Sequence, residues 1–421
     1  MSAPCTQMMV ELFWSYSFFN MTYENVVNTI DNKRRFGKAC GRDVTMEFME
    51  ALGHPEMGKH IIHIAGTNGK GSVAAFVSSI LQAASFSYAK PFKVGLFTSP
   101  HLIEYTERIQ IDGKQISRED VTRIGEQLLE MKLELEPTMF DYWLAMALVY
   151  FKEQQVDYIV LETGLGGAKD STNGLAQVPE VSAITSIGLE HTQYLGNTLA
   201  AIAGEKAGII KPGVPVVIGQ MEEEAFNVIS AKCGALDCEL IQAGAVDKSQ
   251  KLGLFGEYQR NNAAVAVEVV KSLSLYVDNQ TIANGLAKAV WPGRMQIISE
   301  NPYILIDGAH NPSGVKALYD SLTAEFPKEK FSFIMAVMAD KDYVEMADII
   351  RPAVERIFTV TVDSDRALQA SELARVLSES GMDSKACEDY SLALEEAKAY
   401  DNKIIVFGSL YFIGEILANE R

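Results

Sequence analysis

Short apolar runs alternate with stretches of helical periodicity along most of the chain. A short apolar run predicts a buried strand, and such runs lie at residues 61–65, 93–98, 158–162, 181–186 and 214–219. Apolar residues at helical spacing predict helices at residues 73–84, 139–154, 199–207 and 261–273. Strands that alternate with helices indicate an α/β fold with a mostly parallel sheet.

A break in this pattern divides the chain. Pro292 and Gly293, which follow Trp291, interrupt the helical spacing, and a second strand–helix series begins after them. Its strands are predicted at residues 303–307, 331–337, 356–360 and 404–408. We place the boundary near residue 297, because a chain of 421 residues is long enough for two cores.

The first twenty residues do not fit the pattern. They contain apolar side chains such as Phe13 and Trp14 but neither Lys nor Arg, whereas a signal peptide has a positively charged start. Thr22 is a suitable N-cap for a helix that begins at Tyr23. We therefore expect residues 1–20 to be an extension outside the fold.

The charge limits the possible partners. The chain has 37 basic and 55 acidic residues, a net charge of −18, without a conspicuous Lys/Arg run, so nucleic acid and acidic membrane surfaces are not expected as partners. No apolar run reaches the roughly 18 residues of a membrane helix. Among the five cysteines only Cys233 and Cys238 are close in sequence, which favours reduced thiols in the cytoplasm over a zinc site.

A glycine-rich turn between a predicted strand and a predicted helix carries the clearest chemistry. Backbone N–H groups of such a turn can surround a phosphate, and Gly69, Lys70, Gly71 and Ser72 add a cation and a hydroxyl for Mg²⁺. The turn therefore predicts binding of a nucleoside triphosphate. The sequence of this motif is unusual. The common P-loop has Gly where this chain has Ile64, and it has Ser or Thr directly after the Lys, where this chain has Gly71.

Further polar residues follow other predicted strands, where open α/β sheets bind ligands. Ser99 and Glu162 are oxygen ligands that suit Mg²⁺, although Ser99 could belong to a plain turn and Glu162 could be an exposed loop carboxylate. His191 could be a surface residue. Lys206 could complement a helix dipole, or react with CO₂ if burial lowers its pKa.

The second series carries its own candidate site. Asp307 and His310 follow a predicted apolar strand, and the carboxylate of Asp307 could bind a ribose hydroxyl. Arg294, just before the boundary, could reach a phosphate.

Taken in order, these motifs resemble the folylpolyglutamate synthase/dihydrofolate synthase family, which is related to the Mur ligases. The resemblance runs from about Tyr23 to the end, and Gly71 after Lys70 is similar to the phosphate loop of this family. It implies a P-loop ATPase-like, ATP-binding domain at residues 21–297 and a Rossmann-like glutamate-ligase domain at residues 298–421. The motifs lie at residues 66–72, 99–102, 107–109, 162–167, 205–211, 307–312, 340–343 and 408–411.

The resemblance also implies roles for individual residues. Lys70, His191 and Lys206 would be catalytic, with Lys206 carbamylated. Ser99, Glu162 and His191 would bind Mg²⁺. The ATP contacts would come from Gly69, Lys70, Gly71, Ser72, Asn262, Arg294, Asp307 and His310. The wall for the pteroate or folate would consist of Thr138, Met139, Phe140, Asp141, Lys169, Asp170 and Ser171.

The chain departs from the family pattern at three places. Ala168 stands where many relatives have Arg, with Lys169 one place further on. Glu190 replaces a usual Asp, and Asp141 replaces a usual Glu.

The implied function is ATP-dependent addition of L-glutamate to tetrahydrofolate (poly)glutamate, and to 7,8-dihydropteroate if the enzyme is bifunctional, through an acyl phosphate. The expected partners are ATP, Mg²⁺, L-glutamate and the reduced folate or dihydropteroate, bound by a monomer. One alternative is a Mur-type ligase of cell-wall precursors. It is disfavoured because such ligases carry an extra N-terminal domain, whereas only about 40 residues separate Tyr23 from the P-loop strand. A regulatory ATPase or switch is the other alternative.

Overall fold

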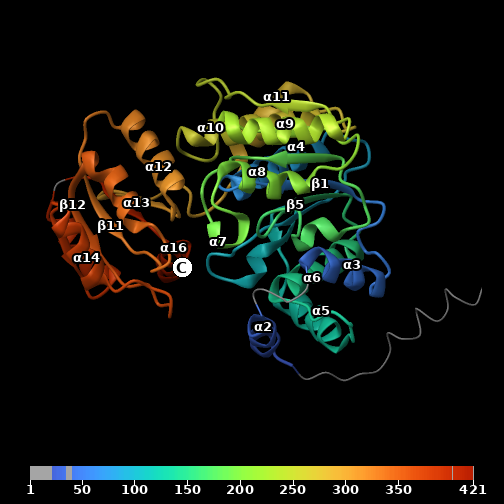
Figure 1. Cartoon of the computed structure of the whole chain (residues 1–421), viewed down its shortest axis with the longest axis horizontal. Helices are drawn as coiled ribbons and strands as arrows, with labels where there is room; N and C mark the ends of the chain where they lie inside the picture. The colour runs from blue at the N-terminus through green and yellow to red at the C-terminus, as the bar shows by residue number, and fades with distance from the viewer. Residues whose placement is uncertain (1–20, 35–39, 401, 421) are drawn as a thin grey trace, which may run out of the picture.

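The structure, a computed structural model, describes residues 21–34, 40–400 and 402–420. The predicted extension at residues 1–20 lies outside the described residues. Figure 1 shows two α/β units side by side, each built around its own sheet. The predicted α/β class with mostly parallel sheets is confirmed.

The first unit contains an eight-stranded sheet with the order β4-β3-β2-β5-β1-β6-β7-β8. Neighbouring strands are parallel except at β2–β3 and β3–β4. The strands are β1 (His60–Ala65), β2 (Val94–Phe97), β3 (Ile109–Ile111), β4 (Lys114–Gln115), β5 (Tyr158–Glu162), β6 (Val181–Ile184), β7 (Val216–Ile218) and β8 (Leu240–Gln242).

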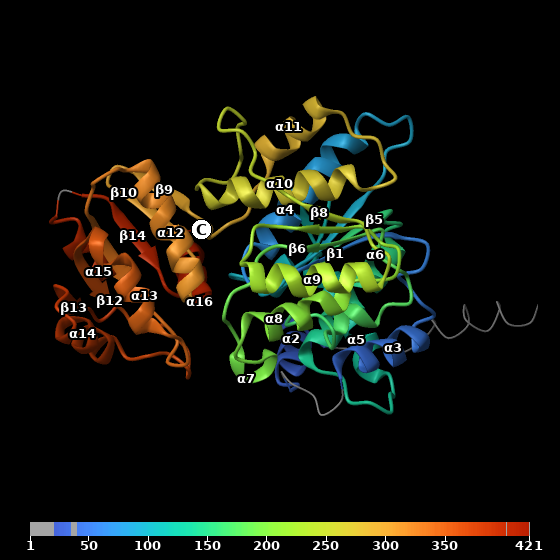
Figure 2. The same cartoon turned by 45° about the horizontal axis from the view of Figure 1, so that its top comes forward.

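Helices cover both faces of this sheet, as Figures 1 and 2 show. In β1, Ile62 and Ile64 pack into the core under α4, α10 and α11, while Ile61 packs into the core under α2, α3, α5 and α6. This alternation follows from the two-residue period of a strand. The helices are α2 (Tyr23–Asp31), α3 (Gly41–Ala51), α4 (Lys70–Ser85), α5 (Arg118–Glu130), α6 (Met139–Glu153), α7 (Thr192–Leu195), α8 (Leu199–Lys206), α9 (Glu223–Ala235), α10 (Tyr258–Lys271) and α11 (Asn279–Lys288).

The second unit contains a six-stranded sheet with the order β13-β12-β11-β14-β10-β9, in which only β9 is antiparallel among the described strands. Residues 289–295 connect it to the first unit. The strands are β9 (Gln296–Glu300), β10 (Tyr303–Asp307), β11 (Phe331–Met335), β12 (Val354–Thr359), β13 (Ser384–Ala386) and β14 (Ile404–Phe407). The helices are α12 (Pro312–Glu325), α13 (Tyr343–Ile350), α14 (Ala370–Glu379), α15 (Tyr390–Ala397) and α16 (Leu410–Asn419).

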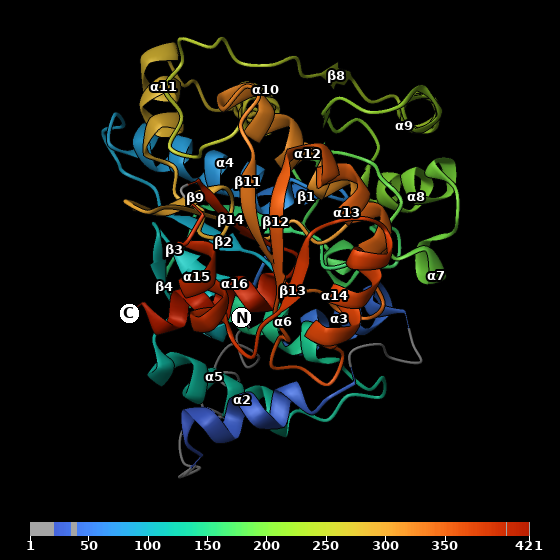
Figure 3. The same cartoon turned by 90° about the vertical axis from the view of Figure 1, so that its left-hand side faces the viewer.

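The two units touch through helices from both faces of the second sheet, α12 and α16. Helix α16 lies between the two sheets in Figure 1, and in Figure 3 the second unit stands in front of the first. Gly414 of α16 packs directly on the backbone of Leu102, since a Cβ there would lie 2.0 Å from the carbonyl oxygen.

Most predicted elements agree with the structure within a few residues. The strands β5 and β10 have the predicted bounds, and Thr22 caps α2 by accepting a hydrogen bond from the Asn25 amide at 3.2 Å. The helix predicted at residues 73–84 is α4, which begins three residues earlier, at Lys70, directly after Gly69. Among the described residues, no helix is both long and apolar enough to cross a membrane.

Candidate functional site

The glycine-rich turn joins β1 to α4 at the carboxyl edge of the first sheet. Gly69 has φ +85°, a conformation that residues with a Cβ rarely adopt, and a Cβ there would lie 2.5 Å from Oδ1 of Asn262. The turn therefore brings its backbone and the start of α4 close to α10, which carries Asn262.

The unusual Gly71 has a structural reason. A Cβ at this position would lie 2.7 Å from Cζ2 of Trp291, which belongs to the connection between the two units. The indole ring of Trp291 therefore covers the first turn of α4. One residue later, the buried Ser72 accepts a hydrogen bond from Nε2 of Gln259 at 3.3 Å.

Lys70 and Glu162 face each other beside this turn. Nζ of Lys70 donates to the carbonyls of Gly66 and Thr67 at 3.0 and 3.2 Å and lies 4.0 Å from Oε1 of Glu162. Glu162, the last residue of β5, also accepts the amide of Ser99 at 3.2 Å. Burial raises the pKa of Glu162 to about 7, and the charge of Lys70 opposes that shift. Glu162 is therefore a buried carboxylate that a cation would stabilise.

Lys206, at the end of α8, points back to the same turn. It is 4% exposed, and its Nζ donates to the carbonyl of Gly66 at 2.8 Å. Burial lowers the pKa of Lys206 to about 7, and the nearby charge of Lys70 adds to this effect. A substantial fraction of this side chain is consequently a neutral amine near neutral pH.

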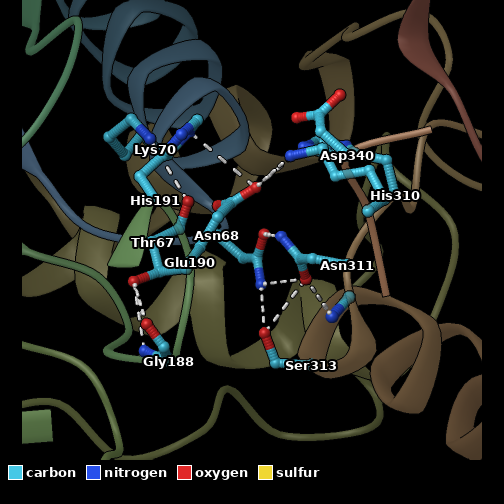
Figure 4. Close-up of polar contacts among 12 residues, drawn as sticks. Thr67, Asn68, Lys70, Gly188, Glu190, His191, His310, Asn311, Ser313 and Asp340 are labelled. Atoms are coloured by element: carbon cyan, nitrogen blue, oxygen red, sulfur yellow. Dashed lines mark hydrogen bonds and ion pairs between the residues drawn. The ribbon is translucent and has the colours of Figure 1, made fainter. Parts of the chain in front are cut away.

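His191 and Glu190 follow β6 in the chain. They lie beside Lys70 and Thr67 of the turn, as Figure 4 shows. Nε2 of His191 lies 4.0 Å from Oε1 of Glu190, and burial lowers the pKa of His191. The same carboxylate oxygen lies 3.2 Å from Nε2 of His310 and 3.2 Å from Nζ of Lys341, both in the second unit. A small cavity of about 30 Å³ brings His191 and Lys206 together with Lys70 and Glu190.

A cleft of about 480 Å³ between the two units collects most of the predicted residues. Every residue predicted to contact ATP or the metal ion lines it, and so do the second-unit cations Lys341 and Arg366. Those predicted residues are Gly69, Lys70, Gly71, Ser72, Ser99, Glu162, His191, Asn262, Arg294, Asp307 and His310.

Asp307 ends β10 and joins the two units at the rim of this cleft. Its carboxylate accepts the hydroxyl of Tyr258 at 2.9 Å and the amides of Met295 and Ala309 at 2.8 and 2.7 Å. Burial raises the pKa of Asp307, while Arg294 and these donors lower it. Tyr258 was not predicted, because nothing in the local sequence of α10 marks a bond to a residue 49 positions away.

Four polar residues of the predicted pteroate wall, Thr138, Asp141, Asp170 and Ser171, are buried in this structure. Asp141 accepts the hydroxyl and amide of Thr138, both at 2.7 Å, and the hydroxyl of Ser171 at 2.5 Å. Asp170 accepts the amide of Leu165 at 2.7 Å. None of the wall residues Thr138, Met139, Phe140, Asp141, Lys169, Asp170 and Ser171 lines the 30 Å³ cavity or the 480 Å³ cleft.

A second cavity, of about 320 Å³, adjoins the cleft through shared residues such as Ser99 and Glu162. Apolar side chains of both units line it, among them Leu102, Trp291 and Leu410. The motif at residues 107–109 shapes its wall, because the carboxylate of Glu107 accepts the amides of residues 102–104 at 2.7 to 3.1 Å. Sequence reasoning singled out these motifs but did not predict the cavity.

The described residues contain no group of three His, Cys, Asp or Glu side chains that could hold a metal ion. The predicted metal set differs from such a group, since it includes the hydroxyl of Ser99.

Both units of the chain match models of known families. The family model of the Mur ligase middle domain matches residues 64–272, and that of the Mur ligase glutamate ligase domain matches residues 293–410. Dihydrofolate synthase/folylpolyglutamate synthase of Bacillus subtilis is 34% identical, over 94% of this chain and 98% of its own length. Folylpolyglutamate synthase of Lacticaseibacillus casei is 32% identical over the same shares, 94% and 98%.

Solved structures of similar proteins show the same two-unit fold. Mycobacterium tuberculosis folylpolyglutamate synthase complexed with ADP matches with a TM-score of 0.85 and 28% identity, over 94% of this chain and 98% of that one. E. coli FolC in complex with DHPP and ADP matches with a TM-score of 0.85 and 26% identity, over 95% and 98%.

Proposed function

The chain belongs to the folylpolyglutamate synthase/dihydrofolate synthase family of Mur ligases, and we propose that it joins L-glutamate to the terminal carboxylate of a reduced folate. The members of this family are ATP-dependent carboxylate–amine ligases. In this proposal residues 21–297 bind ATP, and residues 298–421 complete the site from the second unit.

The nucleotide would lie in the 480 Å³ cleft. Backbone amides from Gly69 to Ser72 would hold the phosphates at the start of α4, where N–H groups and the helix dipole favour an anion. Lys70 would neutralise charge on the transferred phosphoryl group. Asn262, Arg294, Asp307 and His310 line the same cleft, which supports their assignment to the rest of ATP.

The residues beside Lys70 fit Mg²⁺. Glu162 is a carboxylate whose burial raises its pKa to about 7, and the amide of Ser99 brings the adjacent hydroxyl close to it. Oxygen donors of this kind are what Mg²⁺ prefers, usually together with water and substrate phosphates. Ser99, Glu162 and His191 would hold the ion, which would supply charge stabilisation for the phosphoryl group.

Lys206 would act as a carbamate. Its pKa of about 7 leaves the neutral amine available to attack CO₂; the new N–C bond forms and a proton passes to solvent. The product is an anion beside Lys70 and His191, where an ammonium would repel a divalent cation.

The ligation then proceeds in two steps. A carboxylate oxygen of the folate attacks the γ-phosphorus of ATP, giving an acyl phosphate and ADP. The neutral amine of L-glutamate attacks the acyl carbon, and the tetrahedral intermediate expels phosphate and loses a proton to leave the amide. Contact between the two units would limit access of water, which would otherwise hydrolyse the acyl phosphate.

Two places could hold the folate. The predicted wall at Thr138–Asp141 and Lys169–Ser171 remains one candidate, although its polar groups bond to one another here. The 320 Å³ cavity is the other, because apolar side chains such as Leu102, Trp291 and Leu410 form part of its wall and it meets the cleft at Ser99 and Glu162. Two substitutions distinguish the two places. Leu102→Trp fills the 320 Å³ cavity and Phe140→Ala removes a side chain of the predicted wall. The substitution at the place that holds the folate should raise KM for folate without changing KM for ATP.

The observation that carries the proposal is the convergence of Lys70, Glu162 and His191 from the first unit with Asp307 of the second around one cleft. The test measures phosphate release with ATP, Mg²⁺ and L-glutamate, with tetrahydrofolate or dihydropteroate as acceptor. We expect stimulation by tetrahydrofolate. Stimulation by dihydropteroate as well would make the enzyme bifunctional, as the name of the Bacillus subtilis relative suggests.

Controls separate the ligase from the alternatives. Lys70→Met should abolish the stimulation, whereas Lys152→Met, an exposed lysine of α6, should not change it. No stimulation by either acceptor would refute the proposal. Stimulation by a nucleotide-linked peptidoglycan precursor instead would indicate a Mur-type cell-wall ligase, and ATP hydrolysis indifferent to all acceptors would indicate a switch.

A further inference from the structure

Asn68 occupies a position between the phosphate-binding turn and the second unit. Its backbone is held by the two residues that follow β6: the carbonyl accepts the hydroxyls of Thr185 and Ser186 at 2.5 and 3.0 Å, and the amide donates to Ser186 at 3.1 Å. With the backbone held in this way, the side chain points away from the first sheet and toward the start of α12, as Figure 4 shows.

The amide of Asn68 pairs with that of Asn311. Nδ2 of Asn311 donates to Oδ1 of Asn68 at 3.1 Å, and Nδ2 of Asn68 donates to Oδ1 of Asn311 at 3.2 Å and to the hydroxyl of Ser313 at 2.8 Å. Only two amides can satisfy this reciprocal pair, since each side chain must donate and accept. Asn311 is 3% exposed, so the pair is sheltered from water on one side.

Asn311 also stabilises the start of a helix in the second unit. It is the N-cap of α12, and its Oδ1 accepts the amide of Gly314 at 2.7 Å. The residue that fixes the start of α12 is therefore the residue that Asn68 contacts. Any shift of α12 relative to the first unit changes the geometry of the amide pair.

A second polar contact crosses to the second unit on the other side of the turn. Glu190 lies 3.2 Å from both His310 and Lys341, and its loop is tied to the turn because the hydroxyl of Thr67 bonds to the amide and carbonyl of Gly188 at 3.1 and 3.2 Å. The turn between Thr67 and Lys70 is thus flanked by two interdomain contacts.

We propose that Asn68 is a positioning residue, which sets the second unit against the phosphate-binding turn through its amide pair with Asn311. Asn68 does not need to touch substrate for this role. When the units separate, the pair breaks and the turn loses its support from α12; when they approach, the pair aligns Asp307 and His310 with the nucleotide side of the cleft. Closure of the two units is therefore coupled to the conformation of the phosphate-binding turn.

The clean variant is Asn311→Asp. Its carboxylate still accepts the amide of Gly314, so the cap of α12 is kept, but it loses the donor to Asn68 and places a negative charge opposite Oδ1 of Asn68. Asn68→Ala removes the other half of the pair. We call the contact between the two units at Asn68 and Glu190 the seam. Asn284→Asp, at an exposed position on α11, is the matched control for the same chemical change away from the seam.

We expect each of the two seam variants to lower kcat by about tenfold and to raise KM for ATP, because the pair aligns Asp307 and His310 with the nucleotide; a tenfold change corresponds to about 1.4 kcal/mol. The double variant Asn68→Ala/Asn311→Asp should be no slower than the slower single variant, since both remove the same interaction. Losses that multiply to about a hundredfold would overturn the inference.

A structural readout does not depend on catalysis. Small-angle X-ray scattering of the full chain, with and without ADP, should give a larger radius of gyration for the seam variants than for wild type and Asn284→Asp. An unchanged radius in all variants would also overturn the inference. Although the activity readout rests on the proposed ligase function, the scattering does not, so failure of one is distinguishable from failure of the other.

Discussion

At the scale of single residues, burial decides the chemistry of Lys206. The side chain is 4% exposed, its Nζ donates to the carbonyl of Gly66 at 2.8 Å, and its pKa is about 7. A lysine of this kind is poor as a structural cation but suitable as a nucleophile toward CO₂.

Lys206→Ala should therefore lower kcat by at least about a hundredfold, the effect of removing one preorganised charged group from a phosphoryl-transfer site. Acetate or formate should restore part of the activity, because a small carboxylate can occupy the space of the carbamate. The measurement is phosphate release against carboxylate concentration, with Lys232→Ala on the exposed face of α9 as control. Near-normal turnover of Lys206→Ala would rule out the role.

His63 is a buried titratable residue in β1, directly before the phosphate-binding turn. The hydroxyl of Thr172 donates to Asp170 at 2.5 Å, so it must accept from Nε2 of His63 at 2.8 Å, which makes Nε2 the protonated nitrogen of a neutral ring. Burial lowers the pKa of His63 to about 3.

The lowered pKa gives a pH dependence of stability. An unfolded His has a pKa of about 6.5, so between this value and about 3 the unfolded chain binds more protons and the free energy of unfolding falls as the pH falls. His63→Gln can keep the donor without titrating. It should reduce the slope by up to about 1.4 kcal/mol per pH unit in urea unfolding between pH 4 and 7. His60→Gln, half-exposed on the same strand, is the control; equal slopes for wild type and His63→Gln would contradict the argument.

At the scale of elements, the first turn of α4 and the connection at residues 289–295 are in direct contact. The contact is the ring of Trp291 over Gly71, with 2.7 Å between Cζ2 and the place of a Cβ. Helix propensity alone favours Ala over Gly inside a helix by about 1 kcal/mol.

Gly71→Ala should nevertheless lower kcat/KM for ATP by about tenfold, because the methyl group displaces Trp291 or shifts the phosphate-binding turn. Trp291→Leu in the same chain should recover most of the loss by making room for the methyl group. Steady-state kinetics of the two single variants and the double variant measure this coupling. A double variant that is as impaired as the product of the singles would show that the two positions act independently.

The elements also show what the sequence could predict. Fully buried central strands such as β5 and β10 are continuous apolar runs, and they were predicted with their bounds. The edge strands β4 and β13 have two and three residues and exposed side chains, so no apolar run marks them. They exist because a neighbouring strand offers free backbone groups, which is a tertiary effect.

The same distinction holds for the site. Chemistry that lies in one short motif, such as Lys70 after Gly69, is visible in the sequence, and the P-loop turn was predicted from it. The bonds from Asn68 to Asn311 and from Tyr258 to Asp307 join residues 243 and 49 positions apart, and no local pattern encodes them. The local sequence around the domain boundary pointed to Asp307 and Arg294 as candidates, but not to the partners that hold them.

At the scale of the whole molecule, α10 connects the two cores. Most of this helix packs on α4 in the first unit, while Tyr258 at its start packs into the core of the second. The hydroxyl of Tyr258 donates to the buried carboxylate of Asp307 at 2.9 Å, and burial raises the pKa of Asp307. Each unit is thus partly stabilised by the other, and we expect the full chain to unfold in a single transition.

Tyr258→Phe tests this coupling while keeping the ring. One oxygen of Asp307 then retains only the amide of Met295 as a donor, so the free energy of unfolding should fall by about 1–2 kcal/mol. Because the lost bond joins the two units, calorimetry should show the single transition separating into two. KM for ATP should rise as well if Asp307 holds the ribose. Tyr276→Phe, at a side chain that is 82% exposed, should change none of these quantities. A Tyr258→Phe protein with wild-type stability and one transition would mean that the two units are coupled elsewhere, through the seam at Asn68 and Glu190.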